Sequence, residues 1–214
     1  MEIQLKDDRV KRVKLDRVTL AIVDCRAYRP ARRVLQHCIN MCEFADAKLL
    51  THFETEPQDP YLVSIPEITC IEEYSYFMVK RLADYVSTEF VLVAQADGFV
   101  MNPWAWTDEF YEYDYIGAPW HVHQLKPGAD PSHLVGNGGF SLRSKRLCDF
   151  LRDDPTIKET HPEDVVICQK QRFYLEKHGF KFAPVELAYR FSCENYFWNG
   201  AFGQHAYFLL HPCR

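Results

Sequence analysis

The chain has 214 residues, a formal net charge of −5 at pH 7 and a hydrophobic content of 47%. This length and composition are typical of one globular domain and exclude general disorder. The mild acidity argues against nucleic-acid binding through net charge, and no apolar run approaches the ~18 residues of a transmembrane helix. Residues 1–17 are highly charged and lack an apolar stretch. They predict a solvated lead-in or edge segment rather than a secretory signal, and we expect a cytoplasmic protein.

Cysteine and glycine usage excludes several further classes. The eight cysteines form no CxxC pair, which argues against a zinc ribbon, and without a secretory signal we expect them to be reduced. Cys38 and Cys42 lie among apolar neighbours and are interpreted as small buried hydrophobes. Neither GxGxxG nor GxxxxGK[ST] occurs, so a glycine-rich dinucleotide fold and a P-loop nucleotidase lose their main sequence support.

The first part of the chain alternates strand and helix signals. Helical spacing of apolar residues predicts one helix from Pro30 to Cys42 and another from Ile71 to Tyr85. Short apolar runs predict buried strands at Val18–Val23, Ala47–Phe53, Tyr61–Ile65 and Phe90–Ala94. Such alternation is typical of an α/β layer with a largely parallel sheet, whose ligands bind at the carboxyl ends of the strands.

The second part is less regular and holds most of the aromatic residues. We predict a loop over Leu125–His133, helices over Ser144–Leu151 and Thr160–His178, and a strand over Phe180–Val185. No repeat or linker separates the two parts, so we expect residues 1–214 to form a single domain.

The segment Gln95-Ala96-Asp97-Gly98 directly follows the Phe90–Ala94 strand. An acid at the carboxyl end of a buried strand can offer an oxygen to Mg²⁺ or Mn²⁺, which share such ligands with substrate phosphates. The alternative is a turn acid at a strand end.

The glycine-rich segment Gly136-Asn137-Gly138-Gly139 would let the backbone approach a ligand closely. The Asn137 side chain can both donate to and accept from a hydroxyl group. The alternative is a hairpin or bulge turn, because Asn-Gly is a strong turn signal.

Two acids lie at the start of the predicted Thr160–His178 helix. Thr160 and Glu163 fit a capping box, with Pro162 in the first turn. Capping does not explain Asp164, which could extend into a cleft and act as a general base on a substrate hydroxyl. The alternative for Asp164 is a surface acid favoured by the helix dipole.

Late in the chain, Phe202-Gly203-Gln204-His205 places a histidine among aromatic residues. His205 is either a buried structural histidine or a metal ligand that completes a site begun by Asp97. The indole of Trp120 could stack on a sugar ring, although most such aromatic residues are core residues.

The order of these motifs is more specific than any one of them. QxDG at Gln95, YDYIGAPW at Tyr113, GNGGFSLRS at Gly136, PEDVVIC at Pro162, FSCEN at Phe191 and FGxH at Phe202 follow one another in the sequence. From about Val18 to Phe208, the chain resembles an uncharacterised family of glycosyltransferases of bacteria, fungi and large viruses. That family is similar to the GT-A glycosyltransferases.

The resemblance implies a single-domain GT-A-like fold, with a central mixed sheet flanked by helices. Residues 18–100 would form the nucleotide-binding part and residues 101–214 the part that binds sugar and acceptor. It also implies an Asp-x-Asp metal site. This sequence departs from that pattern, since Gln95 holds the first acidic position, which leaves Asp97 and His205 to bind Mn²⁺ or Mg²⁺ together with the diphosphate.

The resemblance further implies roles for individual residues. Asp164 would be the catalytic base of an inverting enzyme, and Glu163 beside it would be the second catalytic residue. Contacts with the nucleotide sugar would come from Asp24, Arg26, Arg81, Gln95, Ala96, Asp97, Trp120, Asn137, Gly138 and Gly139.

We therefore predict a metal-assisted glycosyltransferase that moves a hexosyl or deoxyhexosyl group from a nucleotide-diphosphate sugar, with a UDP-sugar favoured, to a glycan acceptor. Synthesis of a surface polysaccharide or a related glycan is the expected setting. Two alternatives stay open. One is a non-catalytic module that binds nucleotide sugars or glycans, and the other is a metal-dependent phosphohydrolase.

Overall fold

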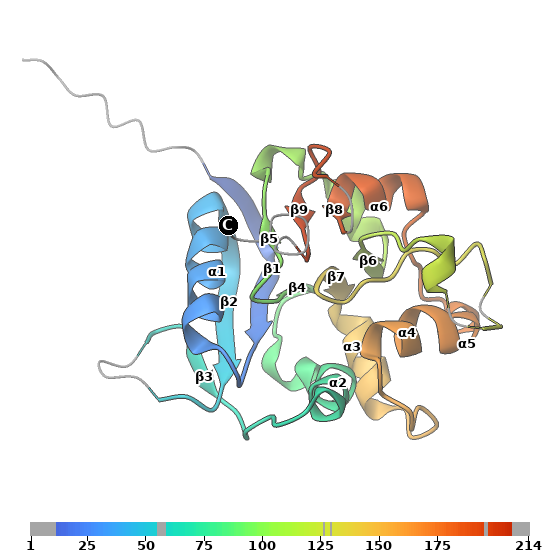
Figure 1. Cartoon of the computed structure of the whole chain (residues 1–214), viewed down its shortest axis with the longest axis horizontal. Helices are drawn as coiled ribbons and strands as arrows, with labels where there is room; N and C mark the ends of the chain where they lie inside the picture. Colours follow the sequence, from blue (N-terminus) through green and yellow to red (C-terminus); the bar gives the residue numbers. More distant parts are fainter. Residues whose placement is uncertain (1–11, 55–58, 126, 129, 195–196, 207–214) are drawn as a thin grey trace, which may run out of the picture.

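The structure is a computed structural model that describes residues 12–54, 59–125, 127–128, 130–194 and 197–206. Its centre is a sheet with the strand order β3-β2-β1-β4-β7-β6, and helices cover both faces (Figure 1). The strands are β1 (Val13–Val23), β2 (Cys42–Thr51), β3 (Leu62–Ser64), β4 (Phe90–Ala94), β6 (Tyr115–Gly117) and β7 (Phe140–Ser144). This confirms the predicted α/β class with a central mixed sheet.

The strand directions determine where a ligand can approach. β1 pairs in parallel with both β2 and β4, whereas β7 runs antiparallel to β4 and β6 antiparallel to β7. Ile22 of β1 lies opposite Ala94 of β4. The segments that begin at Asp24 and Gln95 therefore leave the sheet side by side at the same edge.

The two faces of β1 have different helical partners. Leu20 and Ile22 belong to a buried cluster with α1 (Tyr28–Met41) and α6 (Val185–Phe191). Ala21 and Val23 belong to a second cluster with α2 (Ile71–Lys80) and α3 (Lys145–Asp153). Alternate residues of a strand point to opposite faces, so a continuous apolar run is what a strand covered on both sides requires. No helix in the described ranges has the length and apolar character to cross a bilayer.

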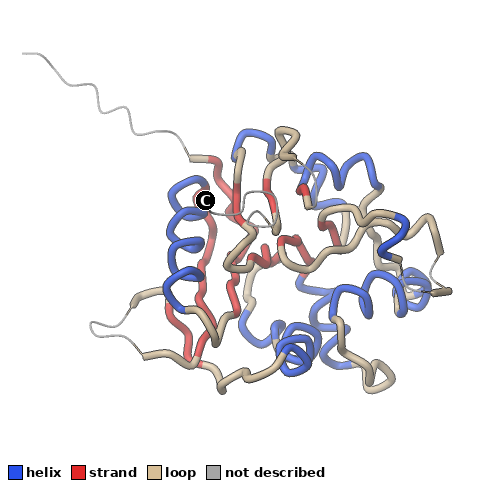
Figure 2. Tube along the Cα trace, viewed as in Figure 1, coloured by secondary structure: helices blue, strands red, loops and turns tan. Residues whose placement is uncertain are grey.

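A small second sheet brings the end of the chain next to β4. It has the order β5-β9-β8, with β5 (Phe99–Val100), β9 (Gly203–Gln204) and β8 (Ser192–Cys193) (Figure 2). β5 follows the turn that holds Asp97, and Phe99 pairs with Gln204. This pairing places His205, which follows β9, beside that turn.

The N-terminal expectations need two corrections. β1 begins at Val13, so the predicted lead-in of residues 1–17 is wrong for its last five residues, because Leu15 is buried while its charged neighbours point outward. Residues 1–11 lie outside the described ranges. β2 begins at Cys42, earlier than the expected Ala47, and Cys42 leaves the helix to do so. Cys38 and Cys42 are buried free thiols, as predicted.

The C-terminal half differs more from expectation. β7 was not predicted, and Phe180–Val185 is not a strand, since only Phe182 forms an isolated bridge before α6 begins at Val185. The expected Thr160–His178 helix instead starts with α4 (Glu163–Val165). It passes through a π-helical segment (Val166–Lys170) and ends as α5 (Arg172–Lys177).

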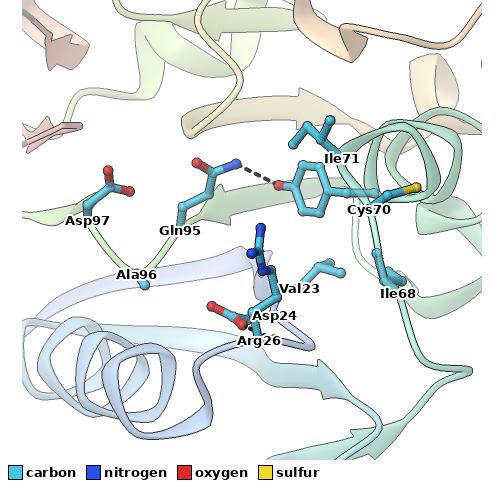
Figure 3. Close-up of a pocket in the computed structure, with 10 residues that line it drawn as sticks. Val23, Asp24, Arg26, Ile68, Cys70, Ile71, Gln95, Ala96 and Asp97 are labelled. Atoms are coloured by element: carbon cyan, nitrogen blue, oxygen red, sulfur yellow. Dashed lines mark hydrogen bonds between the residues drawn. The ribbon is translucent and has the colours of Figure 1, made fainter.

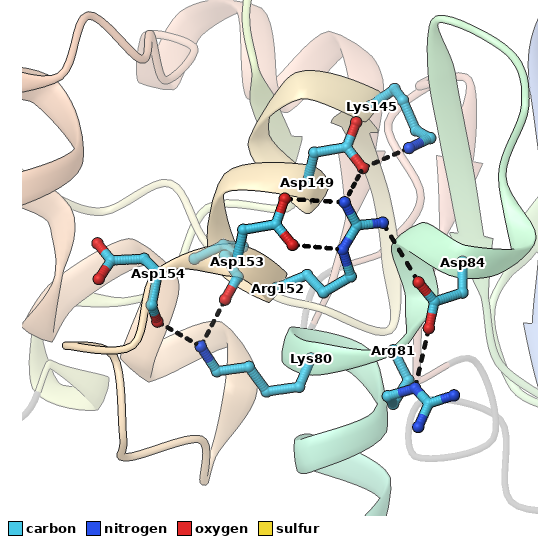
Figure 4. A network of polar contacts seen from close by, with 9 residues as sticks. Lys80, Arg81, Asp84, Lys145, Asp149, Arg152, Asp153 and Asp154 are labelled. Carbon is cyan, nitrogen blue, oxygen red and sulfur yellow. Dashed lines mark hydrogen bonds and ion pairs between the residues drawn. The ribbon is translucent and has the colours of Figure 1, made fainter.

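A polar network joins α2 to the end of α3 (Figure 4). Lys80 Nζ donates to the carbonyl oxygens of Leu151 at 2.6 Å and Asp154 at 2.8 Å. These carbonyls belong to the last turn of α3, which leaves them without helical donors. Lys80 therefore caps α3 from the neighbouring helix.

Candidate functional site

A cleft opens at the carboxyl ends of β1 and β4 (Figure 3). Its volume of about 210 Å³ is below the ~300 Å³ at the lower end of small-molecule sites, so it suits one part of a larger ligand. It is lined by Val23, Asp24, Arg26, Ile68, Cys70, Ile71, Tyr74, Gln95, Ala96 and Asp97. Five residues predicted to contact a nucleotide sugar thus line one cleft, namely Asp24, Arg26, Gln95, Ala96 and Asp97.

Asp24 shapes the turn between β1 and α1. Its Oδ1 accepts hydrogen bonds from the backbone N–H groups of Arg26 and Ala27, both at 2.7 Å. This local turn fixes the backbone of Arg26, whose exposed side chain lies at the cleft.

Gln95 connects three elements. Its Nε2 donates to the hydroxyl of Tyr74 on α2 at 2.8 Å, and its Oε1 lies 3.2 Å from Nε2 of His205. Burial raises the pKa of Tyr74, so its hydroxyl keeps its proton while it accepts this bond. A carboxylate at position 95 could not donate a hydrogen bond to the Tyr74 hydroxyl, because an ionised acid only accepts hydrogen bonds.

His205 lies between two carboxylates. Its Nε2 is 3.4 Å from Oδ1 of Asp97, and its Nδ1 is 3.0 Å from Oε1 of Glu194, which follows β8. Burial alone would lower the pKa of His205, but the hydrogen bonds to Asp97 and Glu194 raise it to about 9. The hydrogen bond to His205 also lowers the pKa of Asp97, against the effect of burial. Glu194 lies within the FSCEN motif, but no pattern in the sequence points to it as a partner of His205.

Asp97 and His205, the predicted metal pair, are therefore adjacent. Among the described residues, no three or more His, Cys, Asp or Glu side chains form a group able to hold a metal ion. The donor set still fits in part, because a metal-bound histidine usually donates its other ring N–H to a carboxylate, which is the position of Glu194. Mn²⁺ or Mg²⁺ held here would take its remaining oxygens from water and substrate phosphate.

Gly138 and Gly139 lie between this pair and a second pair of acids. A Cβ added at Gly139 would come within 2.0 Å of Nε2 of His205, and one added at Gly138 within 2.3 Å of Oε1 of Glu163. Contacts this short mean that a side chain at either position would displace His205 or Glu163, so only the backbone of the turn lies between the two groups. Asn137 holds the turn, since its Oδ1 accepts from the N–H of Gly139 at 3.2 Å and its φ is +35°.

Glu163 and Asp164 have different surroundings. The capping-box prediction is wrong, because α4 has Pro162 at its N-cap and no side-chain capping bond. Glu163 is buried, with Oε1 3.6 Å from Nη2 of Arg143. Asp164 is half-buried and accepts from the N–H of Gly138 at 3.2 Å and from that of Val165 at 2.7 Å. Burial raises the pKa of Glu163, as does the charge of Asp164, while Arg143 opposes both.

Arg143 is a second residue that the sequence analysis missed. It lies in β7 with no exposed surface, and it donates to Oγ of Ser141 at 3.1 Å and to the carbonyl of Gly138 at 3.4 Å. Its ion pair with Glu163 fixes the Gly138–Gly139 turn from the buried side. The one signal in the sequence is a charged residue inside the specific GNGGFSLRS block.

Two predicted contacts lie elsewhere. Arg81 is at the far end of α2, does not line the cleft and pairs with Asp84 at 2.9 Å (Figure 4). Trp120 is buried, and its ring occupies the space where Gly136 lacks a side chain, so it supports the glycine turn from the core side. The structure thus does not bring either residue to the cleft.

Comparisons with known proteins give the following. A family described as a protein of unknown function, DUF5672, matches residues 62–205. No curated protein matches the chain. Among solved structures, the fold is similar to a mannosyltransferase of Pyrobaculum calidifontis in complex with GDP-mannose and Mn²⁺. The TM-score is 0.48 and the identity 11%, over 83% of this chain and 56% of that one. The chain therefore spans little more than half the length of that enzyme.

Two further solved structures are similar. One is a glycosyltransferase involved in glycosylation of the major capsid of PBCV-1, with a TM-score of 0.49 and 13% identity over 88% of this chain and 92% of that one. The other is the apo form of the glycosyltransferase GlyE of Streptococcus pneumoniae. Its TM-score is 0.43 and its identity 13%, over 80% of this chain and 45% of that one.

Proposed function

We propose that this chain, which belongs to the DUF5672 family of proteins of unknown function, is a glycosyltransferase that moves a sugar from a nucleotide-diphosphate sugar to a glycan hydroxyl. One observation carries the proposal. The Asp97–His205 pair and the Glu163–Asp164 pair meet across the Gly138–Gly139 turn, beside a cleft at a sheet edge where α/β folds bind ligands. The ordered sequence motifs give independent support.

The donor would bind with its nucleoside in the cleft between Asp24 and Gln95 and its diphosphate beside Asp97. We favour a UDP-sugar. Asp97 and His205 would hold Mn²⁺ or Mg²⁺, which would neutralise the charge of the departing nucleoside diphosphate. Glu194 would orient the imidazole of His205 through its bond to Nδ1.

Asp164 is the proposed base. As the acceptor oxygen bonds to the anomeric carbon and the bond to the diphosphate breaks, the acceptor proton would move to the Asp164 carboxylate, with inversion at carbon. Asp164 accepts hydrogen bonds from the backbone N–H groups of Gly138 and Val165, which hold its carboxylate in place beside the turn. Glu163 was also a catalytic candidate. Its burial against Arg143 supports a positioning role instead, in which it holds the turn that would cover the sugar.

The test is a screen of UDP-, GDP- and dTDP-sugars with and without Mn²⁺, read as hydrolysis or transfer. Asp97→Ala should remove the metal-dependent turnover. Asp164→Asn should keep donor binding and lose about 10²–10⁴-fold in transfer, the usual contribution of a general base. Glu109→Gln, an exposed acid paired with Arg190, is the control and should retain activity. Near wild-type transfer by Asp164→Asn would refute its assignment as base.

One observation favours a second candidate, a non-catalytic nucleotide-sugar-binding module. Gln95 replaces an acid and is committed to Tyr74 and His205, which leaves Asp97 as the one carboxylate in that segment. Such a module would bind nucleotide sugars, would show the same affinity with or without Mn²⁺ and would form no product. Setting and acceptor stay as proposed from the sequence, namely polysaccharide synthesis in the cytoplasm.

A further inference from the structure

The start of α1 carries arginines whose charge is not compensated. Among the arginines that the structure describes, all but three donate a side-chain hydrogen bond. The exceptions are Arg26, Arg29 and Arg33, which are exposed and have no ion-pair partner within the described ranges. Arg32 on the same helix is paired with Asp59. The first turn of α1 contains no acid.

These three side chains form a row. Arg29 and Arg33 are four residues apart, which places them on one face of the helix. Arg26 precedes the helix and lines the cleft that we assign to the nucleotide sugar. At 1.5 Å per residue, Arg29 and Arg33 are separated by about 6 Å along the axis. That separation exceeds what one anionic group can occupy, so the row suits a ligand with repeated negative charges.

Arg33, at one end of the row, lines a second cleft between α1 and the turn after β4. Its volume is about 210 Å³, and it is lined by Pro30, Arg33, Val34, His37, Ala96 and Phe99. Ala96 also lines the donor cleft, so the two clefts open side by side. His37 fixes this wall, because its Nε2 lies 2.7 Å from the carbonyl oxygen of Val100. Apolar walls with a cation at the rim suit a sugar ring that carries an acidic group.

We infer that Arg29 and Arg33 bind acidic groups of the acceptor, and that the acceptor is an acidic glycan. The inference rests on the proposed function, since it assigns the second cleft to the acceptor and the first to the donor. The guanidinium group pairs with carboxylate and phosphate groups through two parallel hydrogen bonds, which gives the recognition its geometry. Arg26, which lines the donor cleft, is assigned to the nucleotide sugar.

The experiment measures binding of the full chain by calorimetry, without donor or turnover. The probes are oligogalacturonate, which is acidic, and a malto-oligosaccharide of the same length, which is neutral. The variant is Arg29→Gln with Arg33→Gln. The matched control is Arg17→Gln with Arg190→Gln, which removes the same charge from exposed, paired arginines elsewhere.

The wild type should bind the acidic probe, with an affinity that falls as salt is added, and should bind the neutral probe much more weakly. The Arg29/Arg33 variant should lose at least about tenfold in affinity, as expected for lost charge-assisted hydrogen bonds. Its affinity for UDP-sugars should not change, and the control should bind like the wild type.

Three results would overturn the inference. They are equal binding of acidic and neutral probes, equal loss in the control, and an equal loss of UDP-sugar affinity in the Arg29/Arg33 variant, which would assign the row to the donor diphosphate. Failure of the proposed function has a different signature. In that case no nucleotide sugar is bound or turned over, whereas arginine-dependent binding of the acidic probe persists.

Discussion

Glu163→Gln tests whether the glycine turn rests on a buried ion pair. The substitution keeps the shape of the side chain and removes its charge. Arg143, which has no exposed surface, then loses its carboxylate partner at 3.6 Å. At an effective dielectric constant of about 20, two unit charges at this distance interact by about 5 kcal/mol. Breaking one side of a buried pair costs about 3 to 5 kcal/mol, and we expect a loss in that range.

The assay is urea unfolding, with thermal unfolding as a second measurement. For a chain of this length, such a loss lowers the melting temperature by about 6 to 20 °C. Glu109→Gln breaks an exposed pair with Arg190, at 3.0 Å, and should cost less than about 1 kcal/mol. Replacing both buried partners, Arg143→Met with Glu163→Leu, should recover most of the stability, because no buried charge then lacks a partner.

A helix-capping role for Glu163 predicts a different outcome. If Glu163 served only as a helix cap, its loss would cost about 1 kcal/mol, and the double variant would recover nothing. A Glu163→Gln protein with the same unfolding midpoint as Glu109→Gln would therefore refute the buried-pair account. It would also remove the positioning role that we assign to Glu163.

Three further substitutions probe other parts of the fold. Gly139→Ala puts a methyl group 2.0 Å from Nε2 of His205, so it should cost about 1–3 kcal/mol and abolish any rise in melting temperature with Mn²⁺; an unchanged Mn²⁺ response would contradict the geometry. Lys80→Met leaves two carbonyls at the end of α3 without donors and should lower the free energy of unfolding by about 1–3 kcal/mol in urea, whereas wild-type stability would exclude the cap. Burial opposes ionisation of Asp59, but hydrogen bonds, including one from Arg32, lower its pKa. The ionised Asp59 therefore contributes fully to stability above about pH 4, and this contribution is lost as the pH falls through the lowered pKa. Asp59→Asn should flatten the acid side of a curve of unfolding free energy against pH. An unchanged acid side would disprove this.

The first half of the fold could be predicted because its signals are local. β4 is a run of five residues that are all buried, since parallel strands covered on both faces need apolar side chains at every position. The apolar residues of α1 and of α2 likewise recur at helical spacing within each helix's own sequence, so each helix can be predicted without its partners. The start of β1 was missed because charged residues alternate with Val13 and Leu15, and only pairing with β2 shows which of them face inward.

β7 illustrates why the second half resisted prediction. Its sequence, FSLRS, contains polar residues that are all buried, and two of them, Arg143 and Ser144, have acidic partners distant in sequence. Arg143 needs Glu163, and Ser144 donates to Asp114 at 2.6 Å. Intrinsic propensity and periodicity carry no information about such long-range pairings. The sequence of this buried strand is therefore more typical of a turn.

The same limit applies to the candidate site. Residue type and position after a strand identified Asp97, and motif order identified His205. Glu194 could not be found that way, since its role depends on a contact with His205, eleven positions later in the sequence. Glu163 was found for the wrong reason, because a capping pattern is local whereas its actual partner, Arg143, is not.

The surroundings of Gln95 favour an amide over a second acid at this position. His205 already has Asp97 and Glu194 as neighbours, and a third acid would add charge repulsion around a single imidazole. An amide instead accepts from Nε2 of His205 while it donates to Tyr74, which ties the end of β4 to α2 and to β9 at once. Gln95 is thus suited to hold the histidine rather than to bind an ion. A metal bound as we propose would replace the proton on Nε2 of His205 and would depend on Asp97, His205 and the substrate's own phosphates as donors.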